Sequence, residues 1–247
     1  MVGEAGSVRG LDVGSASPPA RAAGKSEGSK RMFASMRRYR LQPGSLAEFL
    51  RRVDESFADE IAAQPGFASY QLIDCGGGDL FTLSMFLEPG QAEASRELAQ
   101  RWTEDNLHDI DHTRFEAIHG ESLVSRAASG MLNPGHVGAA RKCVSIRYYR
   151  LRSGSVAQLL QRVDHLFVDR MRAMEGFEAS HLLDCGDDEV LWISVLRDGD
   201  AVEEADARVA GFVREELTDF RPERIVAIRG DIAVSRSNAA LLEPAHA

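Results

Sequence analysis

The sequence predicts an α+β protein in which two copies of one β-α-β-β-α-β unit pair within the chain and form a single α+β barrel. Residues 34–127 are repeated at 144–237 without a gap, at a constant offset of 110. Strand-like alternation and helical stripes follow one another in the same order in both copies. Roughly a third of the aligned positions are identical, and the period is far longer than that of a solenoid repeat, so each copy is a domain-sized unit.

Three short motifs show the repeat most clearly. Arg37-Arg38-Tyr39-Arg40-Leu41 returns as Arg147-Tyr148-Tyr149-Arg150-Leu151, and Leu72-Ile73-Asp74-Cys75-Gly76 returns as Leu182-Leu183-Asp184-Cys185-Gly186. Val124-Ser125-Arg126 closes the first copy and Val234-Ser235-Arg236 the second. We expect a disordered tail over 1–31, a first repeat over 32–127, a linker over 128–141, a second repeat over 142–237 and a C-terminal tail over 238–247.

The first strand of each copy, near 33–41 or 143–151, is followed by a helix. Ser45 and Glu48, like their counterparts Ser155 and Gln158, have the spacing of a capping box. Apolar residues then recur every three or four positions and give the helix one buried stripe. In the first copy they are Leu46, Phe49, Leu50, Val53, Phe57 and Ile61. Gly66 and Gly176 predict the ends of these helices.

A hairpin, a second helix and a last strand complete each copy. Gly76-Gly77-Gly78 and Gly186-Asp187-Asp188 predict the turns of the two hairpins, where Asp74 and Asp184 serve the turn. In the first copy we expect strands near 67–75, 79–87 and 114–125 and a helix near 91–108, with equivalents 110 positions later. This order is that of the ferredoxin-like fold, a four-stranded antiparallel sheet with both helices on one face. The other face would be bare, so we expect the two sheets to face each other.

Alternation along the strands separates two sets of side chains. We expect the apolar set, which includes Ala34, Met36, Phe81, Leu83 and Met85, to pack against the helices. The other set holds Ser35, Arg37 and Tyr39 in the first strand and Thr82 and Ser84 in the third. Most of this polar set is identical in the second copy, and we expect it to line the space between the two sheets.

Composition excludes several classes of function. A net charge of −9 and a pI near 5.3 argue against binding to nucleic acid or to an anionic membrane, because both need a basic face. No apolar run approaches the roughly 20 residues of a transmembrane helix. Cys75, Cys143 and Cys185 lack C-x-x-C spacing, which favours reduced thiols in a cytoplasmic protein. We expect a monomeric pseudo-dimer or a higher homo-oligomer.

These residues resemble antibiotic biosynthesis monooxygenase domains, which belong to the dimeric α+β barrel superfamily. The resemblance rests on the Arg-Arg-Tyr-Arg strand, Pro65-Gly66-Phe67, the Asp-Cys-Gly hairpin and Ile118-His119-Gly120-Glu121, and it covers both copies. It implies a cofactor-independent monooxygenase that acts on a small aromatic, quinol-like or polyketide-like compound, whose own anion reduces dioxygen. It also implies that no metal or cofactor takes part and that one chain supplies both halves of the barrel.

Such chemistry needs a base, a group that holds the anion and an enclosed apolar space. Our catalytic candidates are His181 as the base, Arg147 as the anion holder and Tyr149 as the group that orients a phenol or enol. Candidates for substrate binding are Arg37, Tyr39, Trp192 and Ser194. The second copy is expected to hold the better-equipped pocket, because Trp192 and His181 replace Thr82 and Gln71 there. The same residues could instead only fill the seam between the two halves.

Two other functional interpretations remain open, and two further kinds of site are disfavoured by the sequence. The fold could bind or sense a small hydrophobic molecule without turning it over, or one half could only scaffold the other. His108 and His112 have the spacing of helical metal ligands, but they lie at a helix end and the second copy has Thr218 and Pro222. Haem degradation in the superfamily depends on an Asn, a Trp and a helix His, and most of that triad is missing here.

Overall fold

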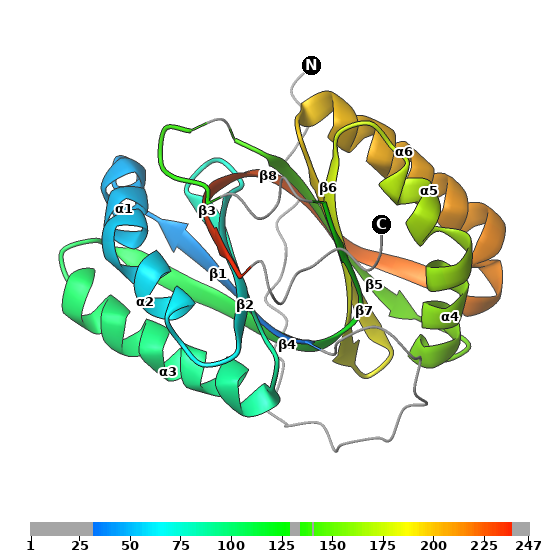
Figure 1. The fold of residues 1–247 in the computed structure, drawn as a ribbon, viewed down its shortest axis with the longest axis horizontal. Helices are drawn as coiled ribbons and strands as arrows, with labels where there is room; N and C mark the ends of the chain where they lie inside the picture. The colour runs from blue at the N-terminus through cyan, green and yellow to red at the C-terminus, as the bar shows by residue number, and fades with distance from the viewer. Residues whose placement is uncertain (1–31, 129–133, 140, 239–247) are drawn as a thin grey trace.

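The computed structural model describes residues 32–128, 134–139 and 141–238. The predicted tail over 1–31, part of the predicted linker and nearly all of the predicted C-terminal tail lie outside these residues. Eight strands form one closed antiparallel barrel in the order β1-β3-β2-β8-β5-β7-β6-β4, with the helices outside (Figure 1). The predicted fold class, two ferredoxin-like halves joined in one α+β barrel, is confirmed.

The elements follow the predicted order in both halves. The first half contains β1 (Met32–Leu41), α1 (Leu46–Arg52), the π-helical turn η1 (Val53–Phe57), α2 (Ala58–Ala62), β2 (Phe67–Asp74), β3 (Asp79–Phe86), α3 (Pro89–Asn106) and β4 (His112–Ala127). The second half contains β5 (Cys143–Leu151), α4 (Val156–Leu166), α5 (Val168–Arg172), β6 (Phe177–Gly186), β7 (Glu189–Leu196), α6 (Gly199–Glu216), the 3₁₀ turn η3 (Thr218–Phe220) and β8 (Pro222–Ser237). Figure 1 shows the two helical layers on opposite sides of the barrel.

Local signals explain most of the boundaries. The capping box of Ser155 and Gln158 forms in the second half, but the Ser45 side chain caps nothing, so that prediction is wrong for the first half. The carboxylates of Asp74 and Asp184 each accept a hydrogen bond from the glycine N–H two residues later, at 2.9 Å, which confirms their turn role.

The last strand of each half is long because it serves both halves. The first part of β4 pairs with β1 and its end pairs with β6, while β8 does the same with β5 and β2. Where β8 crosses β2, a Cβ on Gly230 would lie 2.6 Å from the carbonyl oxygen of Asp74. Its counterpart Gly120 has the same relation to Asp184, at 2.9 Å. The repeated glycine is therefore required by the close approach of strands at each seam.

Apolar side chains from both halves fill the inside of the barrel as one cluster. They include Ala34, Met36, Phe81, Leu83 and Met85 with Val144, Ile146, Leu191, Ile193 and Val195. These are the residues predicted to face the helices, so the face assignment is wrong. Both faces of each sheet are buried, and alternation alone does not show which face lies inside the barrel and which packs against the helices. A closed barrel excludes water more completely than a layer under helices, and it therefore takes the apolar set.

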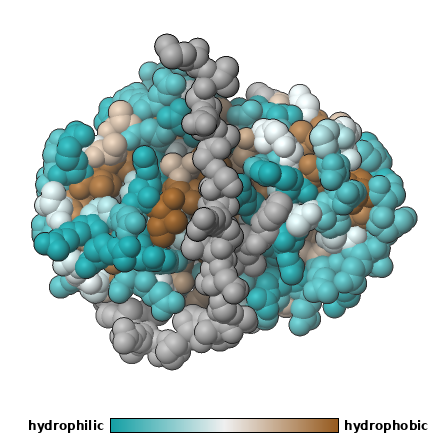
Figure 2. Space-filling model, turned by 180° about the vertical axis from the view of Figure 1, so that it is seen from behind, coloured by the Kyte–Doolittle hydropathy of each residue, from teal (hydrophilic) through white to brown (hydrophobic). Residues whose placement is uncertain are grey.

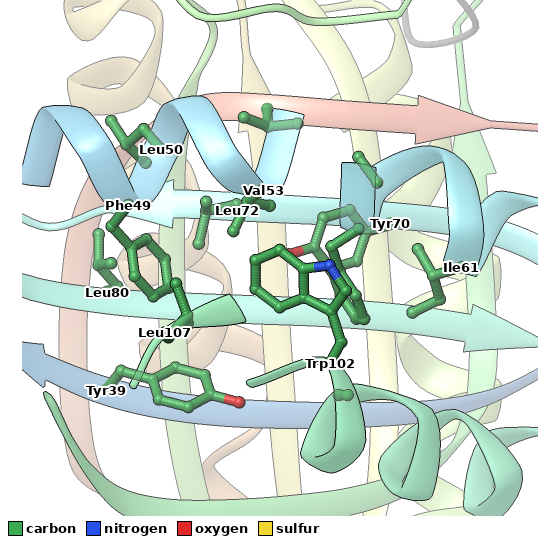
Figure 3. Packing of buried hydrophobic residues seen from close by; sticks show 14 of the residues in the cluster. Tyr39, Phe49, Leu50, Val53, Ile61, Tyr70, Leu72, Leu80, Trp102 and Leu107 are labelled. Atoms are coloured by element: carbon green, nitrogen blue, oxygen red, sulfur yellow. The ribbon is translucent and has the colours of Figure 1, made fainter. Parts of the chain in front are cut away.

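Each half has a second core between its sheet and its own helices. In the first half this core contains Phe49, Val53 and Phe57 from the first helical layer, Tyr39, Tyr70 and Leu72 from the sheet, and Trp102 from α3 (Figure 3). A repeated ion pair joins the first helix of each half to the turn that follows its second long helix, Arg52 with Asp109 at 2.6 Å and Arg162 with Asp219 at 2.9 Å. This contact explains why both members of the pair recur in the second copy.

The outer surface is mainly hydrophilic on the face shown in Figure 2, where apolar areas are separate from one another. Among the described residues, the large apolar side chains that are exposed are Val137 and Leu166. Within the described part of the chain, none of the helices is long and apolar enough to cross a membrane.

Candidate functional site

Four buried polar side chains lie side by side on the helix-facing side of the first half. In the register of β1 and β3, Arg37 lies opposite Thr82, and Ser35 lies opposite Ser84. All four are at most 5% exposed. Each has a side-chain nitrogen or oxygen that makes no hydrogen bond to any described residue. Buried polar groups are normally satisfied, so this patch is able to bind a polar ligand or water.

Arg37 is the charged member of this patch. Burial lowers the pKa of its guanidinium, and the nearby positive charges of Arg96 and Arg114 lower it further. Tyr39 acts in the opposite direction and shares a hydrogen bond with Arg37. No carboxylate of a described residue forms an ion pair with Arg37. A buried cation without a counter-ion is costly, and an anion that reached it would be bound tightly.

A cavity of about 20 Å³ borders this guanidinium. It is lined by Arg37, Tyr39, Phe49, Val53, Phe57, Tyr70, Thr82, Ala99, Trp102, Thr103 and Leu107. Figure 3 shows Tyr39, Tyr70 and Trp102 in this layer, beside the first helical segment. Burial raises the pKa of both tyrosines, which keeps their hydroxyl groups protonated and able to donate. The cavity holds one water-sized molecule as it stands, so an aromatic ligand requires the helices to move.

The π-helical turn forms one wall of the cavity. Val53 and Phe57, its two ends, both line the space. π-Helical turns are rare and are frequent at functional sites. Within the turn, Asp54 is held from outside its own half: Arg236 donates to its backbone oxygen and to its Oδ1, both at 3.0 Å, and the backbone N–H of Val137 donates to Oδ2 at 2.9 Å. The position of this wall therefore depends on β8 and on the linker.

The equivalent layer of the second half is neutralised. Arg147 is buried, which lowers its pKa to about 10, and it forms an ion pair with Asp206 of α6. The other oxygen of Asp206 accepts from Arg229, with 2.6 Å between Nη2 and Oδ2. The position of Asp206 in the repeat is taken in the first half by Arg96. The two halves thus carry opposite charges at one helix position above the same buried arginine.

Trp192 fills the second half at the position of Thr82. Its side chain is 3% exposed, it donates from Nε1 to Ser180 Oγ at 3.0 Å, and it meets Phe167 edge to face with ring centroids 5.2 Å apart. Ser194 is fully buried on the same side, and burial raises the pKa of Tyr149. The cavity beside a buried guanidinium lies in the first half, so this geometry does not favour the second half that the sequence indicated. The indole of Trp192 packs as core.

His181 lies on the opposite side of the sheet from Arg147 and Tyr149. It pairs with Ile193 and faces the barrel interior, where its Nδ1 is 2.9 Å from Ser125 Oγ. Complete burial lowers its pKa to about 4, so the ring is neutral near pH 7. The predicted catalytic group of His181, Arg147 and Tyr149 therefore does not converge on one cavity, since strand alternation places the histidine on the other face.

Three residues near the first-half cavity were not among the predicted site residues: Tyr70, Arg96 and His119. His119 lies opposite Ser35 on β4 with its side chain exposed, and its Nε2 accepts from Arg96 Nη1 at 3.1 Å. Burial and the charges of Arg96 and Arg37 lower its pKa, so it is a neutral base near this site. A comparison of the copies at positions 96 and 206 would have pointed to this cluster, because a charge reversal there is visible in the sequence.

The residues present do not fit a haem group. Neither α3 nor α6 carries a histidine that could bind iron from the helical layer. The indole of Trp192 is 3% exposed and packs against Phe167, so it is not available to a porphyrin.

Solved structures with this architecture belong to several kinds of protein. A protein described as a "putative monooxygenase" from Fusobacterium nucleatum matches with a TM-score of 0.63 at 6% identity, over 85% of this chain and 95% of that one. An anthrone oxidase-like protein matches with a TM-score of 0.51 at 13% identity, over 89% and 98%. A chlorite dismutase mutant from Candidatus Nitrospira defluvii matches with a TM-score of 0.53 at 10% identity, over 84% and 92%.

At these identities the matches show the shared fold alone, over nearly the full length of the other chains. No protein-family profile matches the sequence. No curated protein matches it either.

Proposed function

We propose that the first half binds the anion of a small aromatic compound between its sheet and its helices, and that the protein oxygenates this compound without a cofactor. One observation carries the proposal: Arg37 is 2% exposed, borders a cavity with aromatic walls and pairs with no carboxylate of the described residues. A phenolate or enolate would supply the missing negative charge. Its ring would meet the aromatic side chains that line the same cavity.

The chemistry follows from what such an anion does with dioxygen. A substrate with a ring CH₂ beside a carbonyl loses one proton and becomes an electron-rich enolate. This anion gives one electron to O₂ and the radical pair combines to a peroxide anion. The proton taken from the substrate returns to give the hydroperoxide, and loss of water leaves a new carbonyl. The balance is R₂CH₂ + O₂ → R₂C=O + H₂O. An arginine that stabilises the anion lowers the energy of the first step.

Arg37, Tyr39 and His119 would divide the work. The guanidinium of Arg37 holds the oxygen of the anion, and the protonated hydroxyl of Tyr39 donates to it. His119 is neutral because burial and two arginines lower its pKa, and its Nε2 would accept the substrate proton at neutral pH once Arg96, which donates to this atom, has turned away. The fold shared with monooxygenases and with an anthrone oxidase-like protein supports this reaction class.

Binding without turnover is the second candidate function. The small volume of the cavity and the two buried, protonated tyrosines favour it, because neither tyrosine can act as a base. The two functions share the anion site and differ only in whether oxygen is consumed.

Oxygen uptake with anthrone and with 1,4-naphthohydroquinone tests the proposal. We expect uptake above the buffer rate with the native protein and a loss of at least 10-fold with Arg37→Met, since a charge-assisted hydrogen bond is worth about 1.5–3 kcal/mol. Arg208→Met, which removes an exposed ion pair with Glu204, is the control and should keep full uptake. Binding of these compounds without uptake would favour the second function, and absence of both would reject the site.

A further inference from the structure

The strongest asymmetry in the molecule is the charge at one position of the second helix of each half. α3 lies over β1 and β3, and α6 lies over β5 and β7 in the same way. The repeat makes Arg96 and Asp206 equivalent, while the buried arginine beneath them, Arg37 or Arg147, is the same in both halves. A difference in function between the halves must therefore come from this helix position or from its neighbours.

Asp206 has the contacts that a bound carboxylate would have. One of its oxygens pairs with the buried Arg147, and the other accepts from Arg229 Nε at 2.8 Å and Nη2 at 2.6 Å. Arg229 comes from β8, opposite Ser145. A carboxylate between one buried and one exposed guanidinium is a favourable arrangement for an anion, because both positive charges attract it and Arg229 also donates to it.

The same frame in the first half has Arg37, Arg96 and a neutral His119, and no carboxylate of the described residues forms an ion pair with Arg37. Arg37 replaces Arg147, and His119, opposite Ser35 on β4, replaces Arg229. Arg96 stands where Asp206 would supply the negative charge, and it donates to His119. Glu93 forms an ion pair with Arg96, and the equivalent Glu203 forms one with Arg229 in the second half. Because this glutamate is present in both halves, it does not account for the difference in charge between them.

We propose that Asp206 is a built-in occupant of a second copy of the anion site, and that the residue at position 96 or 206 decides which half binds an anion. Trp192 completes the closure, because it lies opposite Arg147 at the place where Thr82 lies opposite Arg37. The second half thus supplies from its own chain an aromatic ring and a carboxylate next to a buried arginine. The first half has neither this ring nor this carboxylate, so a ligand could supply both. The ligand class that fits is an aromatic ring that carries one anionic oxygen group.

The assignment of the ligand class rests on the proposed function of the first half, whereas the closure of the second half does not. The two can be separated by exchanging the charges. Arg96→Asp should create the missing carboxylate above Arg37, and Asp206→Ala should remove the one above Arg147. Asp206→Asn keeps the shape of the side chain and removes its charge, so it serves if the alanine variant does not fold.

Calorimetric titration with benzoate at low salt gives the number of sites, with inorganic phosphate as the non-aromatic anion. We expect one benzoate per native chain and none for Arg96→Asp. Since Trp192 fills the place of the ring in the second half, the Asp206 variants are combined with Trp192→Thr, which copies Thr82: two benzoates are expected for Asp206→Ala or Asp206→Asn in this background, and one when Arg96→Asp is added. Phosphate should bind at least 10-fold more weakly than benzoate at each site. A folded variant with Asp206→Asn and Trp192→Thr that binds no more benzoate than the native chain would overturn the closure of the second half. Absence of binding by the native chain alone would instead reject the site proposed in the first half.

Discussion

Replacing Arg37 with methionine should make the ligand-free protein more stable. An uncompensated charge left in a protein interior costs about 3–5 kcal/mol. Arg37 is in that situation natively, since it is 2% exposed and pairs with no carboxylate of the described residues. Methionine fills the volume of the arginine stem and gives up the hydrogen bond to Tyr39, which is worth about 0.5–1.5 kcal/mol. We expect a net gain of about 1.5–4.5 kcal/mol in the free energy of unfolding.

Arg147→Met is the matched control for this measurement. It removes the equivalent arginine from a half in which Asp206 already neutralises it, so we expect no gain and a loss of up to about 2 kcal/mol. Urea denaturation of dialysed protein, followed by circular dichroism, gives both values, and a gain of 1 kcal/mol raises Tm by about 2–4 °C for a chain of this size. A fall in stability for Arg37→Met, or an equal shift for the two variants, would refute the idea that the first half holds an unneutralised charge.

Three further predictions concern the barrel. The pKa of His181 is about 4 in the folded protein and about 6.5 in an unfolded chain. The free energy of unfolding should therefore be highest above pH 6.5 and fall by about 3 kcal/mol as the pH drops to 4. His181→Gln, which copies Gln71, should remove most of this fall in denaturation curves measured across that range. Gly230→Ala should lower the free energy of unfolding by about 1–3 kcal/mol because its Cβ would lie 2.6 Å from Asp74 O, while Gly90→Ala, which meets nothing within 4 Å, should not lower it. Arg236→Met should lower the free energy of unfolding by about 1–3 kcal/mol, because it removes the ion pairs of Arg236 with Asp54 and Asp59. The exposed Arg214→Met is the control and should not change Tm measurably. Equal effects of the two variants would mean that Arg236 does not stabilise the π-helical turn.

Much of the fold could be predicted from the sequence because the repeat provides two independent readings of each element. The hairpin turns illustrate this, since Asp74 and Asp184 both hold the glycine N–H that follows. The faces of the strands could not be predicted in the same way. Met36 and Arg37 are both buried, and alternation separates their directions without saying which direction leads into the barrel.

The site was predicted only in part, because residue type was taken as a sign of chemistry. Trp192 and His181 are typical of active sites, yet the first packs against Phe167 and the second faces the barrel interior. Arg37 and Tyr39 were expected at a ligand site, and the structure places both on the wall of a cavity. The decisive charge difference, Arg96 against Asp206, lies on a helix where single charges are common on the solvated face, so it carried no weight without the structure.

The two long strands that serve both halves also determine when the chain can finish folding. β2 pairs with β8, so residues 69–74 wait for residues 231–237, which are synthesised much later. Until then the nascent first half presents an unpaired strand edge and an apolar sheet face meant for the barrel interior. Contacts of such long sequence separation slow folding, and they also make the two halves one cooperative unit. A cell that makes this protein must therefore protect about half of a barrel from aggregation during every round of synthesis.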